Sequence, residues 1–196
     1  MSITKGQLNL AAWLSIVNAV ISLPFIAVSM FLGNMGGIGP RLLQAALSLI
    51  GLGLFIYVLL SLRKLLNSRF QFHDADIYVT LLIWVEVVLV LLTLLSLGSD
   101  KLEFGMHIFS TVVLIPLGIL IIMFGTRVLR LSQDLFGLKK PFAIAQIVTG
   151  IFFVTVILFV LGIIASALGD VILGIIFFRA AKEPISPDEP PQMPCE

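Results

Sequence analysis

Apolar residues in this chain run in long segments that are separated by short polar or glycine-containing breaks. A helix that rises about 1.5 Å per residue needs roughly 20 apolar residues to cross about 30 Å of hydrocarbon. By this measure the expected spans are residues 8–32, 41–62, 77–97, 105–126, 142–161 and 164–180. The pattern predicts an all-α integral membrane protein, a bundle of six transmembrane helices arranged as three successive helical hairpins.

Most of the breaks have the residues of turns. Residues 33–40 hold four glycines and end at Pro40, and residues 98–101 form a second polar turn. The last two spans are separated less clearly, because Asp170 is the only charged residue between Lys140 and Arg179. One helix of that length would be about 57 Å long, so two helices that turn at 162–169 are expected. The alternative is a single broken helix, which leaves five spans.

The composition agrees with a membrane protein. Hydrophobic residues make up 59% of the chain and charged residues 12%, whereas soluble domains hold roughly 45–50% apolar and about 25% charged residues. So few charges cannot cover a water-soluble surface. The net charge of +1 gives no indication of a nucleic-acid partner. The single cysteine, Cys195, cannot form a disulfide within the chain.

Lys and Arg are concentrated at alternate breaks, after the second, fourth and sixth spans, and only Arg41 and Lys101 lie on the other side. Because basic residues are retained on the cytoplasmic side, both termini are expected in the cytoplasm, with the chain in a bacterial-type plasma (inner) membrane. Residues 1–182 would form the transmembrane domain. Residues 183–196, rich in proline and acidic residues, are expected to be a disordered cytoplasmic tail.

Small and weakly polar residues recur at helical spacing within the spans. Membrane helices associate through close packing of such residues and through hydrogen bonds, so these faces should meet other helices. They are Ala11, Ser15, Asn18, Ala19 and Ser22 in the first span, Gln44, Ser48 and Gly51 in the second, His107, Thr111 and Gly118 in the fourth, Gln146 and Gly150 in the fifth, and Gly162, Ala165, Ser166 and Gly169 in the last pair.

Two acidic residues are candidates for a polar or ion site inside the membrane. Glu86 lies about 15 Å deep, where a charged carboxylate is costly, so it should face the interior and find a partner or hold a proton. Asn18 has a comparable depth and is a candidate partner. Asp170 reaches a similar depth if the last helix begins near Ile164, and two acids at one level could bind a cation or pass protons. Alternatively, Asp170 lies in the first turn of that helix and stabilises its start.

Other polar residues offer weaker indications of chemistry. His73, Asp74 and Asp76 are potential metal ligands, but capping of the following helix explains them as well, and His107 is expected to be an interfacial residue. We therefore expect no metal and no cofactor. Basic residues flanking the spans are candidate contacts for anionic lipid headgroups: Arg63, Lys64, Arg69, Arg127, Arg130, Lys139 and Lys140.

The sequence leaves three classes of function open. Phosphate-binding, zinc-protease and serine-hydrolase motifs are missing from it, so the chain is not expected to be an enzyme. The leading hypothesis is a non-catalytic subunit that binds or organises other membrane proteins or lipids, or a second copy of itself, through its small-residue faces. The alternative is a small channel or transporter for an ion or small solute, with Glu86 and Asp170 in the path. A membrane-embedded enzyme is the third.

Overall fold

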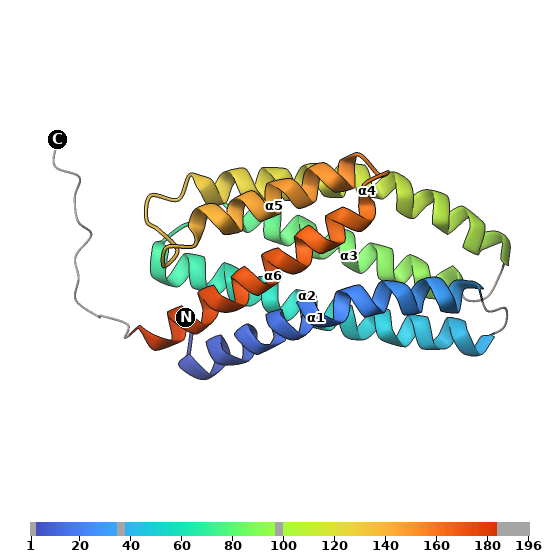
Figure 1. Ribbon diagram of the computed structural model, residues 1–196, viewed down its shortest axis with the longest axis horizontal. Helices are drawn as coiled ribbons and strands as arrows, with labels where there is room; N and C mark the ends of the chain where they lie inside the picture. Colours follow the sequence, from blue (N-terminus) through green and yellow to red (C-terminus); the bar gives the residue numbers. More distant parts are fainter. Residues whose placement is uncertain (1–2, 35–37, 97–99, 184–196) are drawn as a thin grey trace.

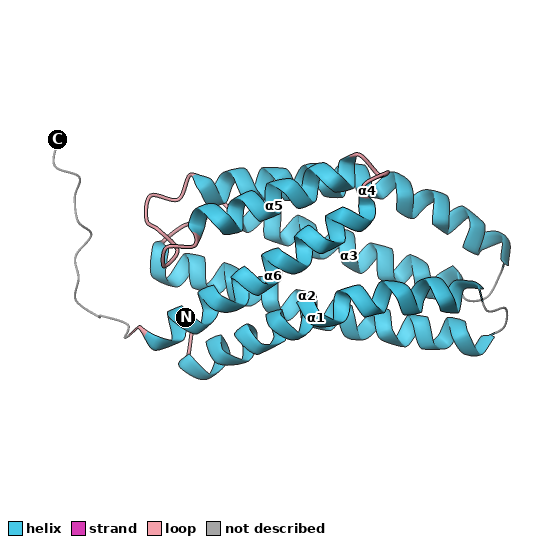
Figure 2. Ribbon diagram, in the orientation of Figure 1, coloured by secondary structure: helices cyan, strands magenta, loops and turns pink. Residues whose placement is uncertain are grey.

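The computed structural model describes residues 3–34, 38–96 and 100–183, and helices are the only regular secondary structure in these ranges. All six helices lie roughly along the long axis of the molecule, and successive helices run in opposite directions (Figures 1 and 2). The prediction of an all-α chain is confirmed. The helices are α1 (Lys5–Asn34), α2 (Ile38–Phe70), α3 (Asp76–Ser96), α4 (Asp100–Leu129), α5 (Lys139–Val154) and α6 (Phe159–Lys182).

The turn between α5 and α6 does not lie at the predicted position. It occupies residues 155–158, and Gly162, which was expected to begin the turn, lies inside α6. A Cβ atom on Gly162 would lie 2.5 Å from ring carbons of Phe153. This glycine therefore permits α6 to pack closely against α5, and close packing rather than a turn explains its presence.

Among the described residues, four helical segments are long and apolar enough to cross a membrane, judged by length and composition. They are Gly39–Phe70, Asp76–Leu95, Thr111–Leu129 and Phe159–Lys182. The 16 residues of α5 give a length of about 24 Å, which is shorter than the hydrocarbon layer. The chain therefore has the helices of a multi-pass membrane protein, with α5 as its shortest helix.

The six helices close into a ring. Each one packs against the next along the chain, and α6 packs against α1, whereas helices on opposite sides of the ring make no close backbone approach within the described residues. In Figure 1 the turn between α5 and α6 lies short of the far ends of α1, α2 and α4. The α5–α6 pair thus completes the ring along only part of the length of the bundle.

The hydrophobic core lies toward the end of the bundle where α1 begins and α6 ends. Many of its largest fully buried side chains come from the last turns of α2, α4 and α6 and from the first turn of α5: Leu62, Leu65, Leu66, Phe124, Phe142, Ile176 and Phe177. The rings of Phe124 and Phe142 meet edge to face with their centroids 6.3 Å apart, a favourable arrangement for aromatic pairs. This end of the ring is therefore filled with large apolar side chains.

Candidate functional site

Several of the small-residue faces expected from the sequence pack within the chain itself. A Cβ on Gly118 of α4 would lie 2.6 Å from the backbone oxygen of Gly150, and one on Gly150 would lie 2.5 Å from that of Gly118. On the other side of the ring, a Cβ on Gly174 would lie 3.1 Å from the backbone oxygen of Ala12. The glycines therefore bring α4 against α5 and α6 against α1 more closely than larger residues would permit.

Asn18 and Asp170 meet at the contact between α1 and α6. The Nδ2 of Asn18 donates a hydrogen bond of 2.7 Å to the Oδ2 of Asp170, and both residues are partly buried. Asp170 lies eleven residues after Phe159, where α6 begins, so it is not in the first turn of the helix. A role in stabilising the helix start is thereby ruled out, and Asn18 pairs with Asp170 rather than with Glu86.

Glu86 lies on the side of α3 that faces the interior of the ring. The buried residues Val79, Leu82 and Val90 precede and follow it at helical spacing, which places Glu86 on the same face. It is partly buried, and no described residue forms a hydrogen bond or ion pair with its carboxyl group. The structure thus brings Asp170 together with Asn18, while Glu86 projects inward from another helix.

Two further polar residues lie beside the Asn18–Asp170 pair. Ser15 is fully buried on α1, and its Oγ makes no hydrogen bond with the described part of the chain. The Nε2 of Gln146 on α5 would lie 2.9 Å from a Cβ on Gly169, the neighbour of Asp170. Both residues belong to the polar stripes of the sequence, but hydropathy and spacing give no reason to connect them with an acid on another helix.

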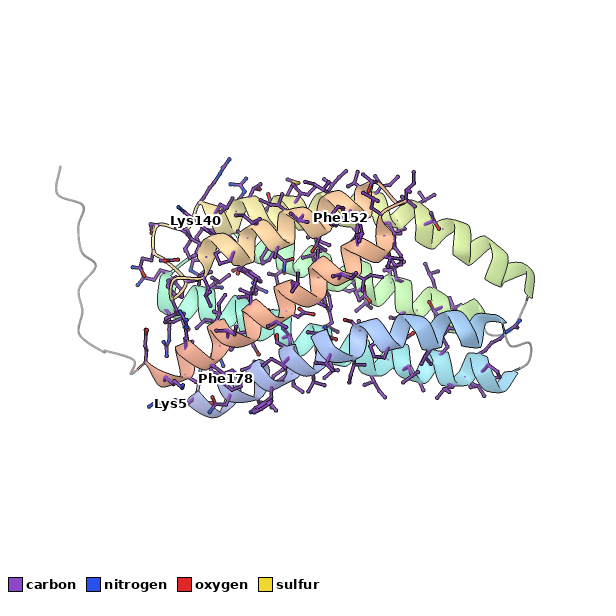
Figure 3. The ribbon with its side chains drawn as sticks, viewed as in Figure 1. Lys5, Lys140, Phe152 and Phe178 are labelled. Atoms are coloured by element: carbon purple, nitrogen blue, oxygen red, sulfur yellow. The ribbon has the colours of Figure 1, made fainter. Side chains whose placement is uncertain are left out.

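Lys5 and Lys140 lie at the end of the bundle that holds the core, while Phe152 lies toward the other end of α5 (Figure 3). Most of the described basic residues belong to that end, because they lie near the ends of α2, α4 and α6 or at the start of α5, whereas Arg41 lies at the start of α2. Asp76, the first residue of α3, accepts hydrogen bonds from this group. Its Oδ1 is 3.0 Å from the Nε of Arg63 and 3.0 Å from the Nδ2 of Asn67. Arg63 therefore ties the end of α2 to the start of α3.

Several other candidate lipid contacts also have partners inside the protein. The guanidinium group of Arg69 lies 6.0 Å from the ring centroid of Phe136, and that of Arg127 lies 5.8 Å from that of Tyr78. Lys139 donates through Nζ to the backbone oxygen of Leu131 at 2.9 Å, and Lys64 donates to Gln7 at 3.4 Å. Arg130 and Lys140 are exposed, which leaves them as the most accessible members of the predicted set.

Arg179 was not among the predicted site residues, but it has a structural role. Its Nη1 donates to the backbone oxygen of Phe136 in the segment between α4 and α5. Phe136 has a positive φ of 53°, and Gly137 follows with a φ of 80°. The C-terminal end of α6 thus supports a turn that precedes α5, a connection that only the tertiary structure makes visible.

The metal ligands considered from the sequence are not assembled into a cluster. Asp74 is exposed, and the Nδ1 of His73 lies 3.4 Å from the Oδ2 of Asp76. Within the described residues no three His, Cys, Asp or Glu side chains are grouped so as to hold a metal ion. The side chain of His107 and the whole of Cys195 lie outside the described residues.

Comparison with known protein families, curated proteins and solved structures yields no match. The interpretation of the site therefore depends on its own chemistry. A carboxylate, two amides and a hydroxyl near one level of the bundle can form hydrogen bonds between helices or bind a cation through their oxygens.

Proposed function

We propose that the chain is a non-catalytic subunit of a plasma-membrane assembly that binds another membrane protein through α2. In this proposal all six helices cross the bilayer, as three hairpins, with both termini in the cytoplasm. The gathering of basic residues at one end supports this orientation. The turn at residues 155–158 is apolar and holds the strongly exposed Ile157. The short α5 fits the bilayer if this turn lies within the outer leaflet.

The observation that carries the proposal is the uneven use of glycine. A glycine inside a helix costs about 1 kcal/mol relative to alanine. At Gly118, Gly150 and Gly174 this cost is offset by close packing inside the chain. Gly53 of α2 is exposed and a Cβ on it would meet no atom within 4 Å. Its absence of a side chain therefore serves no contact within this molecule.

Gly53 belongs to an exposed stripe, the α2 outer face, with Leu43, Ala46, Ile50 and Leu60. These residues are three, four or seven positions apart and so share one side of the helix. The small residues Ala46 and Gly53 would let a helix of another chain approach the α2 backbone closely, and the larger residues would supply the packing area.

The test is to replace Gly53 by leucine and to determine the size of the complex extracted into lipid nanodiscs by native mass spectrometry. The variant is expected to be folded, because the added side chain meets nothing in the chain, and to lose its partner. Gly105→Leu is the matched control, since Gly105 of α4 is also exposed and free of contacts within 4 Å. An unchanged complex in the Gly53 variant would refute the proposal.

Passage of an ion or small solute is a second candidate, favoured by the inward position of Glu86. The large apolar side chains at the basic end, such as Phe124 and Phe177, would have to separate for a path to open there. Flux into proteoliposomes, compared between the native chain and Glu86→Gln, tests this function. Flux no greater than in protein-free liposomes would remove it, and equal flux in both proteins would remove Glu86 from the path.

A further inference from the structure

The contact between α1 and α6 contains polar side chains as well as closely packed apolar ones. Asn18 donates to one oxygen of Asp170 at 2.7 Å. Ser15, three residues earlier on α1, is 0% exposed, and its hydroxyl has no hydrogen-bond partner among the described residues. Buried polar groups in folded proteins nearly always have partners. The unpaired hydroxyl therefore points to a group that the polypeptide does not supply.

The neighbours of Ser15 show that it lies on the side of α1 that faces α6. Ala12 and Ile16 both contact α6 at Gly174, where a Cβ would lie 3.1 Å from the Ala12 backbone oxygen and 2.8 Å from Cγ1 of Ile16. Gly174 is four residues, or about one helical turn, after Asp170. Ser15 is thus located between two contacts with α6, and the second of these is the Asn18–Asp170 hydrogen bond.

A third helix contributes to the same region. The side-chain amide of Gln146 on α5 lies against Gly169, as shown by the 2.9 Å between its Nε2 and a Cβ built there. Gly169 directly precedes Asp170. Because Asn18 uses its Nδ2 to donate to the carboxylate, its Oδ1 stays available as an acceptor. The Asp170 carboxylate therefore lies next to the Asn18 amide, with Ser15 one helical turn before Asn18 on α1 and the Gln146 amide against the residue that precedes Asp170.

We propose that Asp170, Asn18, Ser15 and Gln146 form a binding site for one small monovalent metal cation. Hard cations prefer oxygen ligands, and a single positive charge neutralises one carboxylate, whereas a divalent ion would leave an excess charge in a medium of low dielectric constant. A proton would need only the carboxylate. Binding of a metal ion also gives the Ser15 hydroxyl a partner.

No basic residue on the adjacent helices performs this balancing role. The charged residues of α1 and α5 are Lys5, Lys139 and Lys140, and all three lie in the first two positions of their helices. On α6 itself the next charge is Arg179, nine residues further on and bonded to Phe136. The charge of Asp170 is therefore left for an ion from outside the chain.

This inference does not depend on association through the α2 outer face. The full chain is reconstituted in nanodiscs in choline chloride at alkaline pH, and its melting temperature is followed as NaCl or KCl replaces the choline salt. Radioactive sodium binding is measured by scintillation proximity. Saturable stabilisation by sodium or potassium is expected, and Asp170→Asn should abolish it. Asp74→Asn, which removes the charge of an exposed acid, should leave it unchanged.

Ser15→Ala distinguishes the ion site from an ordinary helix contact. In choline chloride this variant should melt at or above the native temperature, because an unpaired buried hydroxyl has been removed. Its affinity for the cation should fall about tenfold through the loss of one charge-assisted ligand. The proposal is overturned if the native protein shows no saturable response to either cation, or if the Ser15 variant binds as the native protein does.

Discussion

Gly118 and Gly150 lie where α4 and α5 approach most closely. A Cβ atom on either residue would lie only 2.5 or 2.6 Å from the backbone oxygen of the other, which is closer than van der Waals contact. A backbone atom cannot move aside as the end of a flexible side chain does, so the two helices would have to separate. The exposed Gly53 is under no such constraint.

Gly150→Ala is therefore expected to lower the free energy of unfolding by about 1–3 kcal/mol, the range for overpacking. Gly53→Ala should instead raise it by up to about 1 kcal/mol, because alanine favours the helix. Both values are measured by denaturation of the purified monomer in detergent. Equal effects of the two substitutions would mean that the α4–α5 contact is looser than described.

Val156, in the turn between α5 and α6, has a φ of 53°. This left-handed conformation costs an L-residue roughly 1–2 kcal/mol, and a β-branched one is especially unsuited to it. Val156→Gly should therefore stabilise the protein by about 1 kcal/mol, seen as a higher melting temperature. The control is Val154→Gly at the end of α5, which should destabilise. A loss of stability in the Val156 variant would contradict the assigned backbone conformation.

At the scale of single elements, the link between α2 and α3 is organised by Asp76. Its carboxylate forms an ion pair with the Nε of Arg63 at 3.0 Å and accepts a hydrogen bond from the Nδ2 of Asn67 at 3.0 Å. The last two turns of α2 are thereby joined to the first residue of α3. The side chains of Arg63 and Asp76 are 39% and 23% exposed, and solvent screening limits the strength of such a pair.

Asp76→Asn should lower the free energy of unfolding by about 1 kcal/mol. In a double-mutant cycle with Arg63→Gln, the two substitutions together should cost less than the sum of their separate effects. Denaturation in low-salt detergent buffer measures each value, and Asp74→Asn supplies the control for the loss of one charge. Strictly additive effects would show that the ion pair contributes nothing.

At the scale of the whole molecule, the contact between α1 and α6 closes the ring and brings the two ends of the helical region together. The N-terminal end of α1 and the C-terminal end of α6 lie at the same end of the bundle (Figure 1). Basic residues and the apolar core are concentrated at that end, while the α5–α6 pair stops short of the other. The two ends of the bundle thus differ in charge, packing and number of helices.

If six helices cross the bilayer, opposite ends of the bundle must react with membrane-impermeant thiol reagents from opposite sides. In a Cys195→Ala background, Gly39→Cys should be labelled in intact cells, and Lys140→Cys only after permeabilisation. Both positions are exposed, so access to the thiol reports sidedness alone. Labelling of both from the same side would refute the six-span arrangement and every membrane depth inferred from it.

The helical class, the number of helices and most of their boundaries follow from the sequence, because long apolar runs and glycine-containing breaks act locally along the chain. The distribution of Lys and Arg, which predicts the orientation in the membrane, likewise follows from the sequence alone. The inward direction of Glu86 could also be anticipated, since burying an acid in lipid is more costly than directing it toward other helices. These features depend on the transfer of residues from water to lipid more than on which helices contact one another.

Only the tertiary structure decided which faces meet. Asn18 and Asp170 are 152 positions apart. Nothing in the sequence around Asn18 indicates that its partner is Asp170 and not Glu86. The turn between α5 and α6 falls before Gly162, and that glycine lies in α6 against Phe153, a contact that hydropathy does not predict. Close packing between helices depends on the fit of surfaces brought together by the whole ring, and so a pattern along one chain segment cannot specify it.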